Sequence, residues 1–265
     1  MSERSNSASR RRFLGLGLGT AALAACSAPP SAQPGRTAGA ELPARASASP
    51  PASTVPTVLA PGAAAGGPST ELMRGTSGRP ELALTFHGAG DLAITRQILA
   101  TLAQHGARVT VLAVGMWLAA GPDAARMVRD GGHELGNHTW SHPDLASLRP
   151  EPMRAEIERC RDKLAELTGS PGAFFRQSQG QHATAEELRQ AGRAGYPRVL
   201  SYDIDSLDWR DPGPTAIRRA VAAATAGSVV SMHLGHAGTV AALPGILADL
   251  AARGLTAVTA SKLVS

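Results

Sequence analysis

Short apolar runs alternate with longer amphipathic stretches from Glu81 to the end of the chain. The short runs have the length of strands, and the longer stretches repeat apolar residues every three or four positions, as helices do. Strands are predicted at residues 82–86, 108–114, 133–136, 173–176, 199–204, 228–232 and 256–259. Helices are predicted near residues 93–105, 122–130, 151–168, 184–194, 214–226 and 240–253. This alternation is typical of an α/β fold with a mainly parallel sheet.

Reactive side chains follow the ends of these predicted strands. They are His87 and Asp91, His138 and His142, Arg176, Asp205 and Asp208, and His233 and His236. In parallel α/β folds the loops at the carboxyl edge of the sheet build the active site. Five of the eight histidines lie on this edge, which core packing does not explain. We therefore expect one functional site there.

The first 26 residues have the features of an export signal. Arg10, Arg11 and Arg12 precede a weakly apolar stretch, as in twin-arginine signals. That stretch is shorter than the roughly 20 apolar residues that a spanning helix needs. The signal ends in Leu-Ala-Ala-Cys26, which resembles the lipobox of bacterial lipoproteins. We expect Cys26 to carry a lipid that holds the exported protein on the membrane, facing the cell wall or periplasm. The alternative is an ordinary cleavage site that contains a cysteine.

Residues 27–78 are rich in Ala, Pro, Ser and Gly and contain few large apolar side chains. Such a segment cannot bury enough surface to offset the entropy of ordering it, so we expect a linker. Residues 79–265 are long enough for one domain with a sizeable core.

Charge and cysteine content narrow the function further. The formal net charge is +5, but four arginines and one glutamate in the signal account for three of these charges. The remaining charge is small, so a nucleic-acid partner is not indicated. Cys160 shares a helical face with Met153, Ile157 and Leu164, which predicts a buried thiol. With Cys26 lipidated, no disulfide is expected.

Residues 132–142 read GHELGNHTWSH and form the most specific stretch of the chain. His138 and His142 are spaced so that both imidazoles can reach one cation, and neutral imidazole is a common ligand of zinc-type metals. The metalloprotease pattern His-Glu-x-x-His does not fit, because Gly136 and Asn137 interrupt the helix that it requires.

This run closely resembles the second motif of the NodB-homology polysaccharide deacetylases, carbohydrate esterase family 4. The resemblance covers roughly residues 80–265. It implies a distorted (β/α)7-type barrel and a hydrolase that depends on a divalent metal ion. Zinc is the first expectation, and cobalt and nickel are alternatives.

The first motif departs from the family pattern. The family has Thr-Phe-Asp-Asp-Gly, in which the first aspartate is the general base and the second is the third metal ligand. Here residues 85–91 read TFHGAGD. A glycine-rich turn can fold Asp91 back, so we expect Asp91 to complete the ligand set and His87 to act as base. The reverse assignment stays open, as does a loss of catalysis in which His87 only bonds a loop.

Two further stretches resemble the third and fourth family motifs. Residues 175–180 keep an arginine, Arg176, which is expected to hold an acidic partner, but they lack the usual prolines. Residues 205–209 read DSLDW. The resemblance implies that Asp205 orients and charge-stabilises a catalytic histidine and that Trp209 lines the groove for a sugar. We expect Asp208 to cap the loop.

His233 ends the sixth predicted strand, where the family has a Leu-x-His motif. The resemblance implies that His233 is the general acid that protonates the departing amine. His236 follows closely and is a candidate to share this role.

The expected function is removal of N-acetyl groups from a cell-wall or extracellular polysaccharide, either peptidoglycan or a chitin-like polymer. An O-acetyl esterase would use the same site. A non-catalytic carbohydrate-binding lipoprotein is the alternative from another class. The missing aspartate pair favours it, whereas Arg176, Asp205 and His233 oppose it.

Overall fold

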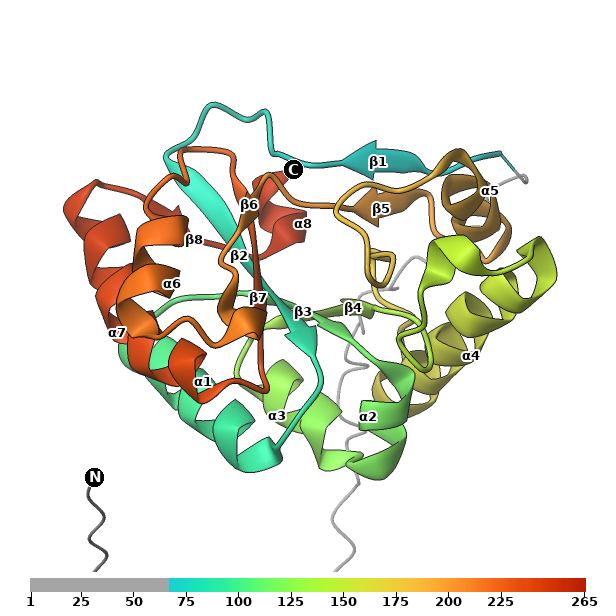
Figure 1. Ribbon diagram of the computed structural model, residues 1–265, viewed down its shortest axis with the longest axis horizontal. Helices are drawn as coiled ribbons and strands as arrows, with labels where there is room; N and C mark the ends of the chain where they lie inside the picture. The colour runs from blue at the N-terminus through green and yellow to red at the C-terminus, as the bar shows by residue number, and fades with distance from the viewer. Residues whose placement is uncertain (1–66) are drawn as a thin grey trace, which may run out of the picture. The chain divides into compact units, whose positions relative to one another are not determined.

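The computed structural model describes residues 67–265 (Figure 1). The predicted signal, the lipidation site at Cys26 and most of the expected linker lie outside the described residues. Within residues 67–265 no helix is both long and apolar enough to cross a membrane.

A parallel sheet forms the centre of the fold, in the strand order β4-β3-β2-β7-β6, and β8 pairs with β2 (Figure 1). Residues 82–86 of β2 are buried, so this strand runs through the core. The prediction of an α/β fold with a parallel sheet is confirmed. The strands are β2 (Glu81–Gly88), β3 (Thr110–Ala113), β4 (Glu134–Asn137), β6 (Ile204–Asp205), β7 (Val229–His233) and β8 (Thr256–Ala257).

A second, two-stranded sheet consists of β1 (Thr70–Leu72) and β5 (Arg198–Leu200). Phe175 forms parallel bridges to Asn137 and Val199, so it links the end of β4 with β5. The strands thus follow a curved path, as in a distorted barrel. Among the described strands no ladder joins β5 to β6, so the barrel stays open there.

Helices surround the strands (Figure 1). Leu102, Ile217 and Leu250, from three different helices, belong to the same buried cluster as Leu82 and Leu84 of β2. Cys160 is fully buried, as predicted. The helices are α1 (Leu92–Gln104), α2 (Gly115–Ala120), α3 (Asp123–Asp130), α4 (Pro150–Thr168), α5 (Ala185–Arg193), α6 (Pro214–Val221), α7 (Ala237–Ala252) and α8 (Ala260–Leu263), with 3-10 turns η1 (Leu145–Ser147) and η2 (Asp208–Arg210).

The folded domain begins before residue 79, which corrects the predicted linker of residues 27–78. Strand β1 lies inside that range. The Glu71 carboxylate accepts hydrogen bonds from Ser201 Oγ at 2.6 Å and Ala183 N at 2.9 Å. Arg74 forms an ion pair with Asp203. Polar contacts hold this segment, so its low apolar content did not reveal a strand.

Two predicted elements are shorter than expected. Helix α6 ends at Val221, and the Arg253 guanidinium donates to the carbonyl of Ala222 just beyond it, at 3.1 Å. The predicted strand 108–114 ends at Ala113, and the short helix α2 follows at Gly115. The apolar run continues through Trp117, so hydrophobicity alone did not mark where the strand becomes a helix.

Candidate metal centre

The histidines of the site come from separate strands that end at one edge of the sheet. His87 lies in β2 and is the register partner of His233 in β7. His138 directly follows β4. Because parallel strands end at the same edge, residues far apart in the sequence meet here. The structure thus brings His87, His138, His142 and His233 together at the predicted edge of the sheet.

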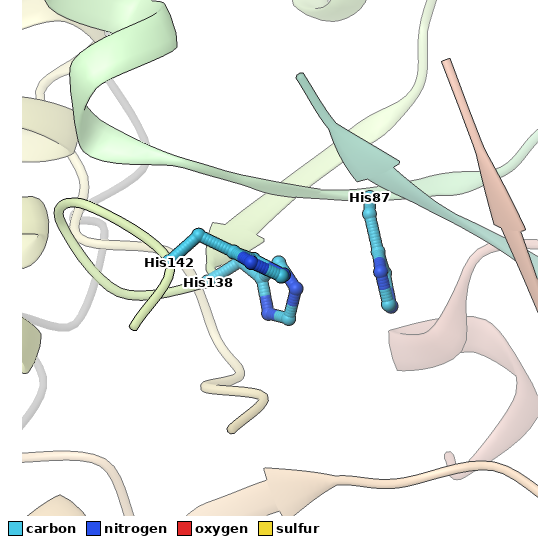
Figure 2. A group of neighbouring side chains, drawn as sticks. All are labelled: His87, His138 and His142. Carbon is cyan, nitrogen blue, oxygen red and sulfur yellow. The ribbon is translucent and has the colours of Figure 1, made fainter. Parts of the chain in front are cut away.

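His87, His138 and His142 form a group in which the candidate ligand atoms all lie within 4.8 Å of one another. The ring centroids of His87 and His138 are 4.1 Å apart, and those of His138 and His142 are 4.8 Å apart. Figure 2 shows His138 and His142 close together, with the ring of His87 facing them. Three convergent imidazoles are a donor set that suits a divalent metal of the zinc type.

Unpartnered nitrogens support this fit. His138 Nδ1 lies 3.1 Å from the carbonyl oxygen of Arg176, which leaves Nε2 for another partner. His138 Nε2 and His87 Nδ1 are both buried, and neither has a hydrogen-bond partner among the described residues. Burial, together with neighbouring histidines, lowers the pKa of His87 and of His138 well below the ordinary value. Both rings are therefore neutral, which is the form that binds metal.

The loop between His138 and His142 is held against helix α4. The carboxylate of Glu156 accepts hydrogen bonds from Trp140 N at 3.0 Å, Ser141 N at 2.8 Å and Ser141 Oγ at 2.9 Å. His142 itself has a φ of 59°, in the left-handed region. The loop therefore needs external partners to keep His142 facing His138.

Asp91 does not join this group, which corrects its predicted role as third ligand. Its exposed side chain caps helix α1 and accepts a hydrogen bond from Ala93 N at 2.7 Å. Gly90, with a φ of 97°, packs closely against Gly235. The glycine-rich turn thus lets two backbones approach instead of returning Asp91 to the histidines. His87 takes the third position, as in the reverse assignment.

Gly88 stands where the family has its second aspartate, and the structure has no room for a side chain there. A Cβ atom at this position would lie 2.9 Å from Val111 Cγ1, 3.0 Å from Ala113 Cα and 3.0 Å from the Trp117 indole. Trp117 is fixed because its Nε1 donates to the carbonyl of Gly90 at 3.0 Å. The indole therefore fills part of the space beside Gly88, and Val111 and the Ala113 backbone fill the rest.

Asp208, not Asp205, pairs with His233, which corrects the predicted role of Asp205. Asp208 Oδ1 lies 2.7 Å from His233 Nδ1, and Oδ2 accepts from His233 N at 2.8 Å and from Thr239 Oγ1 at 2.6 Å. Burial alone would raise the pKa of Asp208, but the hydrogen bonds from His233 and Thr239 outweigh it and the pKa is lowered. Asp208 is thus a buried carboxylate anion.

Asp205 instead organises the loop that precedes η2. Its carboxylate accepts from Leu207 N at 2.8 Å and from Trp209 Nε1 at 3.3 Å. Leu207 has a φ of 57°, and this turn brings Asp208 to His233 while Asp205 stays at the pocket.

Arg176 is fully buried, but it does not hold the acidic partner that the sequence predicted. Its Nε donates to the carbonyl of Leu200 at 2.6 Å and its Nη2 to that of Ser201 at 3.3 Å. Nη1 has no partner among the described residues. Burial lowers the pKa of Arg176 to about 9. Among residues 67–265 the guanidinium thus bonds backbone carbonyl oxygens and no carboxylate.

A pocket of about 380 Å³ opens beside the histidine group. Trp209 lies at the pocket and is 46% exposed. His236 does not line the pocket and contacts Asp211, with 2.9 Å between Nδ1 and Oδ1, so it does not share the position of His233. The pocket is lined by His87, His142, Gln179, Gly180, Tyr202, Asp205, Trp209, Ser231 and His233.

Comparison with known proteins identifies the family. The family model described as polysaccharide deacetylase matches residues 74–199. A peptidoglycan-N-acetylglucosamine deacetylase of Bacillus cereus is 31% identical over 188 residues, which cover 69% of this chain and 87% of that protein. The chain belongs to the polysaccharide deacetylase family. A chitooligosaccharide deacetylase of Rhizobium leguminosarum bv. phaseoli is 32% identical over 162 residues, which are 60% of this chain and 70% of that relative.

A solved structure agrees with this membership. The crystal structure of the Bc1960 peptidoglycan N-acetylglucosamine deacetylase superimposes with a TM-score of 0.69 at 28% sequence identity, over 73% of this chain and 92% of that chain. The α/β fold of the deacetylase family is therefore shared.

Sequence reasoning did not find every residue that shapes the site. In the sequence, nothing distinguishes Glu156 from the other acidic residues of α4. Trp117 lies in an apolar run, and the sequence does not predict its contact with Gly88. Tyr202 and Gln179 line the pocket, although the sequence assigned no role to either residue.

Proposed function

We propose that this chain is a metal-dependent deacetylase that removes N-acetyl groups from a cell-wall or extracellular polysaccharide of the peptidoglycan or chitin type. The observation that carries this proposal is the group of His87, His138 and His142 beside a pocket that also holds His233. The relatives that are named as deacetylases of peptidoglycan and of chitooligosaccharides support the substrate class.

His87, His138 and His142 would hold the metal. When bound, a divalent ion polarises the acetamide carbonyl and makes the attacking water more acidic. Zinc suits a set of three imidazoles, and cobalt and nickel also accept these ligands. The described donors bring no negative charge to the ion, because the aspartate pair of the family is absent.

His233 is positioned to protonate the leaving nitrogen. Asp208 holds its Nδ1 and stabilises the imidazolium that forms during proton transfer. Trp209 offers an exposed indole face at the pocket, and its bond to Asp205 fixes that face for a sugar ring.

Acetate release tests the proposal. The mature protein should release acetate from acetylated chitooligosaccharides or peptidoglycan, and a chelator should stop this release. An O-acetyl esterase would release acetate only from an ester such as acetylated xylan. Binding of metal and oligosaccharide without acetate from any substrate would favour the non-catalytic lipoprotein.

We further propose that the protein is exported by the twin-arginine-type signal and anchored through lipidated Cys26. The signal features at residues 9–26 support this proposal. Cys26→Ser should release the protein from the membrane fraction of cells. Unchanged retention of this variant would contradict the lipid anchor.

A further inference from the structure

Hydrolysis of an amide requires two proton transfers. A base takes a proton from the attacking water, and an acid gives a proton to the leaving nitrogen. His87 stands at the family's base position, but it lies with His138 and His142 as a metal ligand. The site therefore lacks a separate residue for the first transfer.

We propose that His233 carries out both proton transfers, first as base and then as acid, an inference that rests on the proposed function. His233 lines the pocket, and its ring centroid is 4.4 Å from that of His87. The strand register places the two residues side by side on β7 and β2. His233 thus stands next to the proposed metal ligands and faces the pocket that would receive the substrate.

The hydrogen bonds of Asp208 set His233 in the form that a base needs. The Asp208 carboxylate accepts from His233 N, from His233 Nδ1 and from Thr239 Oγ1. Because a carboxylate anion can only accept, Nδ1 of His233 must carry its proton. Nε2 of a neutral His233 is then free to accept a proton from water.

Other acidic or basic groups near the pocket are less suited to this transfer. Asp205 is the register partner of Ser231, so it lies one strand farther from His87 than His233 does. Its carboxylate also accepts two hydrogen bonds within its own loop. Burial raises the pKa of Tyr202, so the phenol keeps its proton. Asp91 caps α1 at the surface.

The proposed cycle balances without a further reactant. His233 Nε2 takes a proton from water as the water oxygen bonds to the acetyl carbon. The same proton passes to the amide nitrogen as the carbon–nitrogen bond breaks. Acetic acid and a free amine leave, acetic acid loses its proton to solvent, and His233 is neutral again.

A pair of substrates separates the two roles of His233. An acetylated chitooligosaccharide has a poor leaving group that needs a proton, whereas 4-nitrophenyl acetate has a leaving group that needs none. For zinc-loaded His233→Ala we expect a loss of about 100-fold or more on both substrates. Its zinc affinity should stay within about threefold of wild type, since His233 lies outside the ligand set. Added imidazole should partly restore hydrolysis of the aryl ester. His105→Ala, the same change at the end of α1, is the control.

Three results would overturn the inference. The first is a His233→Ala variant that hydrolyses the aryl ester at the wild-type rate and fails only on the amide, because His233 would then be an acid alone. The second is a larger loss on the aryl ester in Asp205→Asn than in His233→Ala. The third is loss of zinc binding in His233→Ala. A wild-type protein that releases acetate from neither substrate would contradict the proposed function itself.

Discussion

Two carboxylates three residues apart have different partners in this site. Asp208 contacts His233, whereas Asp205 contacts Trp209. We predict that Asp208→Asn lowers kcat on acetylated chitooligosaccharides by about 100-fold or more, because the amide would permit the wrong histidine tautomer. Asp205→Asn should act mainly on KM, through the loosened Trp209. Steady-state kinetics of both variants measure this difference, and a larger kcat loss in Asp205→Asn would contradict the assignment.

At Gly88, Val111, Ala113 and Trp117 together crowd a return to the family's aspartate. A side chain there would press on the indole and on Val111. We predict that Gly88→Asp lowers the free energy of unfolding by about 1–3 kcal/mol, as overpacking does. Urea denaturation measures this change.

The double variant Gly88→Asp with Trp117→Ala is the control for that explanation. If the two side chains compete for the same space, the double variant should lose less free energy of unfolding than the sum of the losses in the two single variants. Additive losses would show that the cost at Gly88 arises elsewhere.

At the level of elements, helix α4 positions the loop between His138 and His142, two of the proposed metal ligands. The Glu156 carboxylate is the acceptor for Trp140 N and Ser141 N. We predict that Glu156→Gln weakens zinc affinity by about 10-fold, since groups that orient ligands typically contribute this much. Titration of zinc against a competing chelator measures the affinity.

Glu158→Gln is the matched control, because Glu158 lies on the same helix and forms only an exposed ion pair with Arg154. This variant should bind zinc as wild type does. Equal affinities in Glu156→Gln and Glu158→Gln would show that the loop does not depend on Glu156.

Long elements were predictable from the sequence, and short ones were not. Helix α4 repeats its apolar face over 19 residues and ends at Gly169, which has a φ of 75°. Strand β1 has three residues and depends on polar contacts of Glu71, so no hydrophobic periodicity predicts it. Helix α2 lies within an apolar run in which strand and helix look alike.

At the level of the whole molecule, buried histidines link stability to pH. Burial, helped by the nearby Arg108, lowers the pKa of His133 to about 4 from the ordinary 6.5. Below pH 6.5 the unfolded chain therefore binds a proton that the folded protein does not. The burial of His87 and His138 acts in the same direction. We predict that the metal-free protein loses stability as the pH falls from 6.5 to about 5.

Urea denaturation across this pH range measures the loss. His133→Leu should weaken the dependence of stability on pH. His105→Asn, a change at the exposed end of α1, should leave this dependence unchanged. A midpoint that is the same at pH 6.5 and at about pH 5 would contradict the prediction.

The location of the site was predictable, but the assignment of its ligands was not. Strand ends mark the edge where side chains meet, and His138 and His142 were found by their spacing. Whether Asp91 or His87 is the third ligand depends on the turn after His87. This turn can bring Asp91 back toward His138 and His142, or it can start helix α1. That choice follows from Gly90 packing on Gly235 and from the cap on α1, which are contacts between distant segments.

Zinc affinity of wild type, His87→Ala and Asp91→Ser tests the three-histidine site most directly. Serine keeps the cap on α1 but removes the carboxylate, so Asp91→Ser isolates the ligand question. We predict that His87→Ala binds zinc about 100-fold or more weakly, while Asp91→Ser stays within about threefold of wild type. The opposite order, with Asp91→Ser losing zinc and His87→Ala retaining it, would contradict the assignment of His87 as the third ligand.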